Sequence, residues 1–295
     1  MTTVTCDMHV TCDNYFLTMP TMTMANYPRL PLEVVEQIID IVAAKSWYYN
    51  EYEDFPSLKA CALVCHSFLA MCRKHIFASV NLNRRRLIST SDDLNHLLSN
   101  SPHLAVYIRN LHYNVKENEF VPKRLPWLSS MFKKLVKLQV LSISYWDSEP
   151  GRKLDWMSSS ERKVLLPLFH LPTLTSISLF TIRNFDLADL AGCINLKKFE
   201  IESLECSTGV GKNLEALPAT PVTLERLVID DKSVKRLCDA RRPDGKPIID
   251  FFSLKKIKAA AGRLDSMKEL FGMCRNLHEV KLLSMSPLHL ISSPI

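Results

Sequence analysis

Glycine is scarce in this chain, with seven among 295 residues. None of them belongs to a G-x-G-x-x-G or G-x-x-x-x-G-K pattern, the loops whose backbone approaches phosphates closely. The G-x-S-x-G turn that presents the serine of many hydrolases is missing as well. These absences disfavour nucleotide-dependent chemistry and serine hydrolysis, and we expect a protein that is not an enzyme.

Long apolar runs are also lacking. No segment approaches the roughly 20 apolar residues of a membrane-spanning helix, so we expect no membrane partner. The first 26 residues contain Thr-rich and Met-rich patches without a basic region or a continuous apolar segment. Residues 1–26 are therefore expected to be a disordered leader and not a targeting sequence.

What is present is typical of a globular protein, with 47% hydrophobic and 23% charged residues and a length that allows one or two domains. The net charge of +6 is spread over short, distant basic pairs, which favours solvated faces over a nucleic-acid partner. Nine cysteines, an odd number, lie far apart along the chain. Reduced thiols in an intracellular protein, cytoplasmic, nuclear or both, are the expected state.

Residues 27–82 have the pattern of three short helices. Pro31 suits a first helical position, and the apolar residues that follow it keep helical spacing: Leu32, Val35, Ile38, Ile39 and Val42. A second helix is predicted to carry Leu58, Cys61, Ala62, Cys65 and Phe68 on one face, and a third short basic segment spans 72–77. Three short helices bury little surface, so we expect this unit to lean on a partner or a neighbouring domain.

This unit resembles the F-box in the form common among fungal F-box proteins. The matching pieces are Leu30-Pro31-x-Glu33, the Ile38-Ile39 pair, the word at 60–65, Phe68 where the family often has Trp, and the segment 75–77 before a strand. The resemblance implies that the module docks on a Skp-type adaptor and, through it, on a cullin. It assigns the adaptor contact or its support to Leu30, Pro31, Glu33, Val34, Ile38, Ile39, Leu63, Val64 and Phe68.

From residue 100 onward an L-x-x-L-x-L pattern returns at intervals of roughly 20 to 40 residues, starting at Ile108, Leu138, Leu174, Leu196, Leu224, Leu254 and Leu277. The pattern is similar to the leucine-rich repeat. We therefore expect an α/β fold in which the F-box-like module, 27–82, is followed over 83–295 by an irregular leucine-rich-repeat-like solenoid, an arc or horseshoe. The alternative is an α/β domain with a mostly parallel sheet and no true repeat.

Residues between the repeat's apolar positions point away from the core, because side chains alternate along a strand. They are the candidates for binding a protein target, together with Trp146 in the long gap between two repeats, which could instead cover the edge of the core. The candidates are Asn110, His112, Ser142, Ser144, Trp146, Ser178, Phe180, Glu200, Arg226, Lys256 and Lys281.

A cluster of potential metal ligands lies at Cys61, Cys65, His66, Cys72 and His75. Zinc sites usually contain a C-x-x-C pair from a turn, whereas Cys61 and Cys65 are one helical turn apart on an apolar face. Cysteine commonly packs as a small hydrophobe, so we expect neither a metal nor another cofactor.

The combined features predict the substrate-recognition subunit of a Skp–cullin–F-box E3 ubiquitin ligase. One alternative is a leucine-rich-repeat scaffold without a ubiquitin role, in which Leu30, Ile38 and Val64 pack on the repeats as a cap. The F-box interpretation instead predicts that these side chains form an exposed apolar patch. A third hypothesis, a hydrolase using a Cys or His on the sheet rim, predicts one unusually reactive thiol.

Overall fold

The computed structural model describes residues 30–49, 56–82, 90–115, 125–145, 152–202, 220–242, 244–260 and 264–283. The expected disordered leader, 1–26, and the candidate Trp146 lie outside these ranges. The described part is an α/β fold with a mostly parallel sheet and several helices.

Three helices come first: α1 (Leu32–Tyr49), α2 (Pro56–Ala62) and α3 (His66–Ile76). The prediction that one helix carries residues from Leu58 to Phe68 is wrong, because the chain turns between Ala62 and His66. The amides of Leu63 and Val64 bond three residues back, which tightens the end of α2, and Cys65 has an extended backbone. The turn presents Leu63 and Val64 at its tip.

Among the described residues, eight strands form one sheet, and each strand pairs in parallel with the strand that precedes it in the sheet. The strands are β1 (Ser79–Leu82), β2 (Asn110–Val115), β3 (Val140–Tyr145), β5 (Ser176–Phe180), β7 (Lys198–Glu202), β9 (Arg226–Ile229), β11 (Lys256–Ala260) and β12 (Glu279–Leu283). The last two residues of each predicted apolar triplet fall on a strand of this sheet from β2 to β12, and the first lies two residues before that strand, so the strand prediction is confirmed. β1 lies within the predicted helical module yet pairs with β2.

The same backbone hydrogen bonds occur at each junction between neighbouring strands of this sheet. A carbonyl just before one strand accepts from two consecutive amides at the start of the next strand; Gln139, for example, accepts from Thr175 at 2.9 Å and Ser176 at 3.0 Å. The accepting carbonyls are those of Ala78, Arg109, Gln139, Thr175, Lys197, Glu225 and Lys255. The sequence repeat is therefore matched by a repeating backbone unit.

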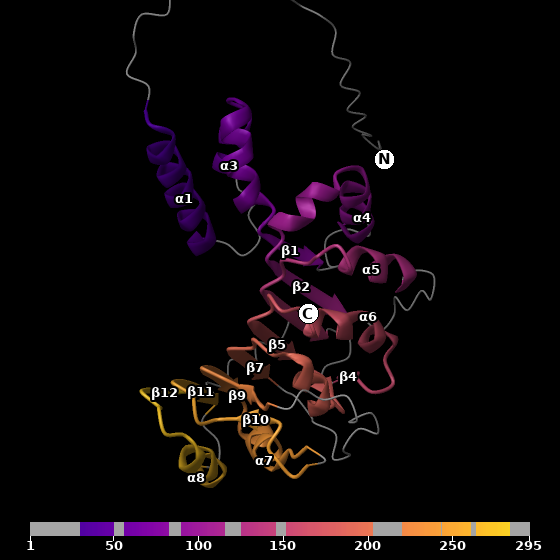
Figure 1. The fold of residues 1–295 in the computed structure, drawn as a ribbon, viewed down its shortest axis with the longest axis vertical. Helices are drawn as coiled ribbons and strands as arrows, with labels where there is room; N and C mark the ends of the chain where they lie inside the picture. Colours follow the sequence, from indigo (N-terminus) through magenta and orange to yellow (C-terminus); the bar gives the residue numbers. More distant parts are fainter. Residues whose placement is uncertain are drawn as a thin grey trace, which may run out of the picture.

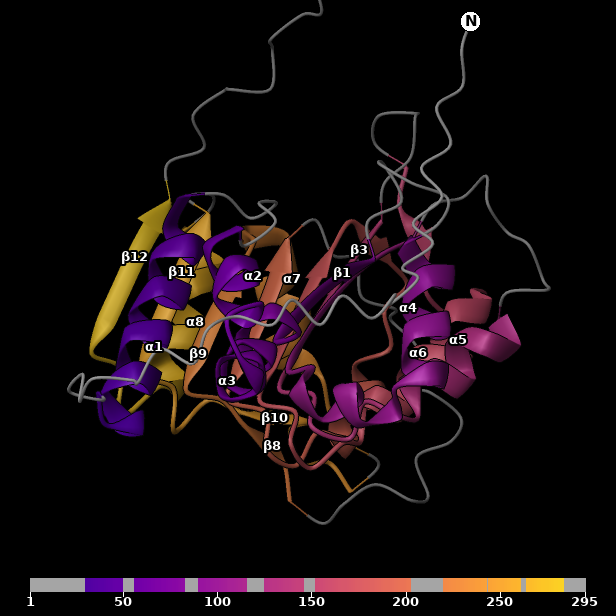
Figure 2. The same cartoon turned by 90° about the horizontal axis from the view of Figure 1, so that it is seen from above.

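The connections between strands contain α4 (Thr90–Asn100), η1 (Pro102–Tyr107), α5 (Leu125–Phe132), α6 (Ser160–Phe169), η4 (Leu187–Gly192), α7 (Asp231–Asp239) and α8 (Leu264–Met273). Two pairs of short strands lie outside the main sheet: β4 (Leu154–Asp155) with β6 (Ile182–Arg183), and β8 (Val222–Thr223) with β10 (Ile249–Asp250). Figures 1 and 2 both show α4, α5 and α6 on one side of the first strands and α1 on the other. Among the described residues, helices therefore cover one face of the sheet, and the opposite face, which we call the open face, carries no helix that connects its strands.

The buried apolar residues of the described chain form two separate clusters. The large cluster lies between the sheet and the helices that connect its strands, and it includes Leu111, Leu141, Ile177 and Phe199, which are aligned across neighbouring strands. The small cluster lies within the N-terminal helices and consists of Ile39, Ala43, Leu58 and Cys72, with partly buried neighbours. The helices thus have a core of their own, and a modest one.

A buried polar network holds the segment before α6 against η4. The indole of Trp156 donates to Asp189 Oδ2 at 2.7 Å, and Arg162 donates to both oxygens of the same carboxylate at 2.7 and 2.8 Å. Phe169 and Phe185 pack around the indole, which is fully buried. Trp156 therefore belongs to the core, and its only polar atom is satisfied there.

Candidate functional site

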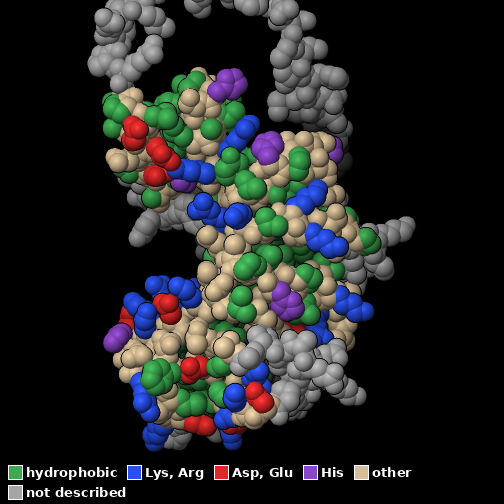
Figure 3. All heavy atoms as spheres, viewed as in Figure 1, with side chains coloured by type: hydrophobic (Ala, Val, Ile, Leu, Met, Phe, Trp, Pro, Cys, Tyr) green, Lys and Arg blue, Asp and Glu red, His purple; other side chains and the backbone are tan. Residues whose placement is uncertain are grey.

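The N-terminal helices expose a group of apolar side chains on α1, just before it and in the turn after α2, which we call the N-terminal apolar surface. Its members are Leu30, Leu32, Val34, Ile38, Ile41, Leu63 and Val64, with exposed fractions between 37% and 87%. Figure 3 shows green hydrophobic side chains over this end of the molecule. Contiguous exposed apolar residues mark protein–protein contact sites in many soluble proteins.

Helix α1 is apolar on two sides, which is why it can pack and still present this surface. Ile39 and Ala43 point into the small cluster and are 1% and 2% exposed. Val34, Ile38 and Ile41 follow one another at helical spacing on another side and stay exposed. A helix that is apolar around most of its circumference is normally covered on every side. The described part of this chain covers only one side of α1.

The residues that the resemblance assigns to the adaptor contact divide into two groups. Leu30, Pro31, Glu33, Val34, Ile38, Leu63 and Val64 are exposed. Ile39 is buried and Phe68 is half-buried against the small cluster, so these two side chains support the helices and Ile39 offers no surface to a partner.

The sequence pattern lists Leu32 among the apolar residues at helical spacing and does not include Ile41; both are exposed, at 57% and 56%. The sequence of α1 contains more apolar residues than one buried helix face requires. Val34, Ile38 and Ile41, at i, i+4 and i+7, form a second apolar stripe that could have been recognised from the sequence.

Ion pairs fasten α1 to α3 beside the apolar surface. Lys74 Nζ lies 2.6 Å from Glu36 Oε1 and 3.0 Å from Asp40 Oδ1, and His75 Nε2 lies 2.8 Å from Asp40 Oδ1. The hydrogen bond to Glu36 raises the pKa of Lys74, and the hydrogen bond from Lys74 lowers the pKa of Asp40. Both groups therefore stay charged near neutral pH, and the pairs add to the apolar contacts between the two helices.

The open face of the sheet carries almost all of the predicted target-binding residues. Pairing between strands aligns them in rows that cross the sheet. The first row is Ser79, Asn110, Val140, Ser176, Lys198, Arg226, Lys256 and Glu279, and the second is Asn81, His112, Ser142, Ser178, Glu200, Val228, Lys258 and Lys281. Ser144 and Phe180 pair with each other beyond these rows. Ser178 is 6% exposed and donates to Glu200, so it offers less to a target than predicted.

Charge divides this face into two halves. From β1 to β5 the two rows contain Ser, Asn and His with one Val, whereas from β7 to β12 charged side chains predominate. Lys198 pairs with Glu200 at 2.9 Å, and Glu279 pairs with Lys256 at 2.6 Å and Lys281 at 3.0 Å. The hydrogen bonds from Lys256 and Lys281 lower the pKa of Glu279 to about 2, so its carboxylate stays ionised at physiological pH.

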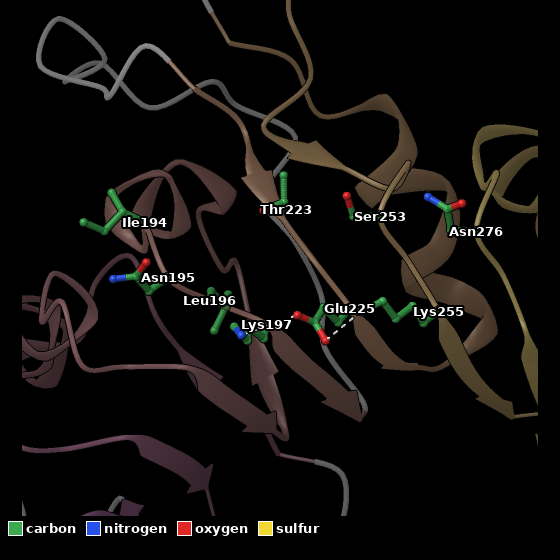
Figure 4. Close-up of a pocket in the computed structure, with 9 residues that line it drawn as sticks. All are labelled: Ile194, Asn195, Leu196, Lys197, Thr223, Glu225, Ser253, Lys255 and Asn276. Atoms are coloured by element: carbon green, nitrogen blue, oxygen red, sulfur yellow. Dashed lines mark hydrogen bonds and ion pairs between the residues drawn. The ribbon is translucent and has the colours of Figure 1, made fainter.

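A small polar cavity of about 300 Å³ lies near the starts of β7, β9 and β11. Figure 4 shows Glu225 between Lys197 and Lys255, which approach it at 3.5 and 3.4 Å. Asn195 and Asn276, at the same rim, donate to the carbonyls of Pro172 and Phe252. These polar groups brace the turns between strands, and their hydrogen-bonding capacity is largely used within the chain.

Apart from Cys65, which is exposed, the described cysteines are buried or half-buried in the two clusters or beside them. Burial raises the pKa of Cys193 and Cys238 to about 12 and that of Cys274 to about 11, which leaves almost no thiolate at neutral pH. Burial also raises the pKa of Cys72, which belongs to the small cluster. Within the described ranges, no three His, Cys, Asp or Glu side chains are grouped so that they could hold a metal ion.

Comparison of the chain with models of known protein families and with curated proteins gives no match. In the part of the chain that the structure describes, no helix has both the length and the apolar character needed to cross a membrane. Any function must therefore be inferred from the N-terminal apolar surface and the open face of the sheet.

Proposed function

We propose that this chain is the substrate-recognition subunit of a Skp–cullin–F-box E3 ubiquitin ligase. In this proposal the N-terminal helices are an F-box module that binds a Skp-type adaptor, and the adaptor connects the chain to a cullin. The observation that carries the proposal is the N-terminal apolar surface. It includes Leu30, Val34, Ile38, Leu63 and Val64, all of which the F-box resemblance assigns to the adaptor contact.

The energetics of this surface support a protein partner. Each apolar square ångström removed from water contributes about 25 cal/mol, so covering several large exposed side chains favours association. Their placement on α1 and on the turn after α2 gives a partner two rigid points of contact. The ion pairs of Lys74 keep α3 and α1 together before any partner arrives.

The rest of the chain would hold the target. We propose that 83–295 is an irregular leucine-rich-repeat-like solenoid; the repeating junction bonds and the strand order support it. Its open face would receive a protein target and present it to a separate ubiquitin-transferring enzyme. The chain itself would perform no chemistry, because raising the effective concentration of the target is sufficient. We place this activity inside the cell, in the cytoplasm, the nucleus or both.

In the scaffold hypothesis the N-terminal helices are a cap that packs on the repeats. A capping role requires Leu30, Ile38 and Val64 to pack on the sheet, but these side chains are 62%, 47% and 67% exposed. This exposure favours the adaptor-binding proposal over a cap. If the chain does not bind the adaptor in the following experiment, a repeat scaffold without a ubiquitin role becomes the better interpretation.

The test is co-expression with a Skp-type adaptor followed by size-exclusion chromatography. The two proteins should co-elute in equal amounts, and Leu63→Ser with Val64→Ser should reduce co-elution strongly, because both side chains lie in a turn and contribute little to the core. The matched control is Val106→Ser with Val136→Ser, which removes exposed valines, 48% and 50% exposed, from the other part of the chain. A stable monomer that ignores the adaptor would exclude the ligase proposal.

A further inference from the structure

The open face contains a group of cations whose arrangement is unfavourable without a ligand. Lys198, Arg226 and Lys256 are direct neighbours along one row, on β7, β9 and β11. Lys258 and Lys281 are direct neighbours in the next row, on β11 and β12. Like charges placed opposite each other on adjacent strands destabilise a sheet. The sequence places cations at these positions nevertheless.

Internal pairing leaves this group with an excess of positive charge. Glu279 pairs with Lys256 and Lys281, and Lys198 pairs with Glu200. Arg226 and Lys258 are exposed, and neither has an ion pair with an acidic residue in the described ranges. On β9, β11 and β12 the open-face cations Arg226, Lys256, Lys258 and Lys281 are therefore balanced by the single carboxylate of Glu279.

The shape of the surface makes this group accessible. Figure 3 shows blue side chains gathered at the end of the molecule formed by β11, β12 and α8, and the outline is hollowed between that end and the N-terminal helices. The hollow lies on the side of the sheet away from α4, α5 and α6 (Figure 1). An elongated partner lying in the hollow would reach the cations of the three last strands.

We propose that the open face of β9, β11 and β12 binds an acidic peptide segment of a protein partner, with Arg226 and Lys258 as its main contacts. This inference rests on the proposed role as a target receptor and specifies the chemistry of the target. Carboxylates of the acidic peptide supply the negative charges that these cations lack within the chain. Strands about 4.8 Å apart place the cations of β9, β11 and β12 within about 10 Å across the sheet, the length of about three extended residues.

A nucleic acid fits this surface less well. Its phosphates form a continuous line of negative charge at closely spaced intervals. A duplex lying on the cations would extend over Glu200 and Glu202 on β7, whose carboxylates repel it. A short acidic segment can place its charges on the cations and end before these carboxylates.

Fluorescence anisotropy with the full chain and a labelled peptide that has Asp at alternate positions tests the proposal. Binding should exceed that of the Asn counterpart and weaken as salt screens the charges. Arg226→Ser with Lys258→Ser should weaken binding roughly tenfold, since two exposed ion pairs with the peptide are lost. Lys255→Ser is the matched control: it removes the same type of charge with similar exposure, 51%, but Lys255 pairs with Glu225 outside the open face.

Glu279→Gln provides a variant whose effect cannot arise from misfolding. Removing the carboxylate that competes for Lys256 and Lys281 should strengthen peptide binding about two- to threefold. Equal binding of the Asp and Asn peptides, equal losses in the control and the double variant, or tighter binding of a single-stranded oligonucleotide would each overturn the proposal. The assay contains no adaptor, so its failure is distinguishable from failure of the ligase proposal.

Discussion

The N-terminal helices and the sheet use their apolar residues differently. The sheet places the apolar side chains of successive strands on one face and covers them with helices, so most of them are buried. The helices bury Ile39, Ala43, Leu58 and Cys72 and leave a larger number of apolar residues exposed. The two parts therefore differ in how completely their apolar side chains are covered. The sheet gains its core by adding strands, whereas the described helices leave much of their apolar surface exposed.

The largest expected effect is on the sheet. Phe199 is fully buried in the large cluster, and Phe199→Ala should lower the free energy of unfolding by about 3–5 kcal/mol, because the substitution removes a large side chain and leaves a cavity. Chemical denaturation followed by circular dichroism measures this loss. Val228→Ala, on the open face of the neighbouring strand β9, is the control and should cost far less. Equal losses in the two variants would show that the large cluster does not dominate the stability of the sheet.

A smaller effect is expected in the helices, and it should stay local. Ile39→Ala should destabilise the small cluster by about 2–4 kcal/mol and, by loosening α1, weaken the proposed binding to an adaptor. Hydrogen exchange resolved by mass spectrometry should show faster exchange in α1 to α3 and little change in β2 to β11. Ile41→Ala on the same helix removes an exposed side chain and should leave exchange unaltered. Faster exchange throughout the sheet in Ile39→Ala would contradict two separate cores.

The smallest effect concerns charge on the last strand. The pKa of Glu279 is lowered from 4.5 to about 2 by Lys256 and Lys281. A lowered folded pKa means that the pairing stabilises the fold at pH values above about 4.5 and is lost as the pH falls toward about 2. NMR titration of the Glu279 carboxyl carbon should show this low midpoint, and Lys281→Ala should move the midpoint up toward 4.5. An unchanged midpoint in Lys281→Ala would mean that this ion pair does not form in solution.

Local patterns allowed much of the fold to be predicted. The strands follow from apolar residues at alternate positions, such as Leu141 and Ile143 on β3, because burial of one strand face requires that alternation. The break between α2 and α3 was missed because Cys61, Cys65 and Phe68 keep helical spacing across it. The network of Trp156, Arg162 and Asp189 was missed because its members come from separate segments, and their contact depends on the fold.

For the open face of the sheet, the amino-acid sequence is enough to show which residues point away from the core. The period of the repeat placed Asn110, Arg226 and Lys281 between core positions, and strand geometry requires such residues to share one face. Only the tertiary structure decided which of α1's two apolar stripes is covered, since Ile39 and Ile41 look alike in sequence and differ in what packs against them. It also decided that Arg226 adjoins Lys198 and Lys256, because pairing register depends on residues far apart in the chain.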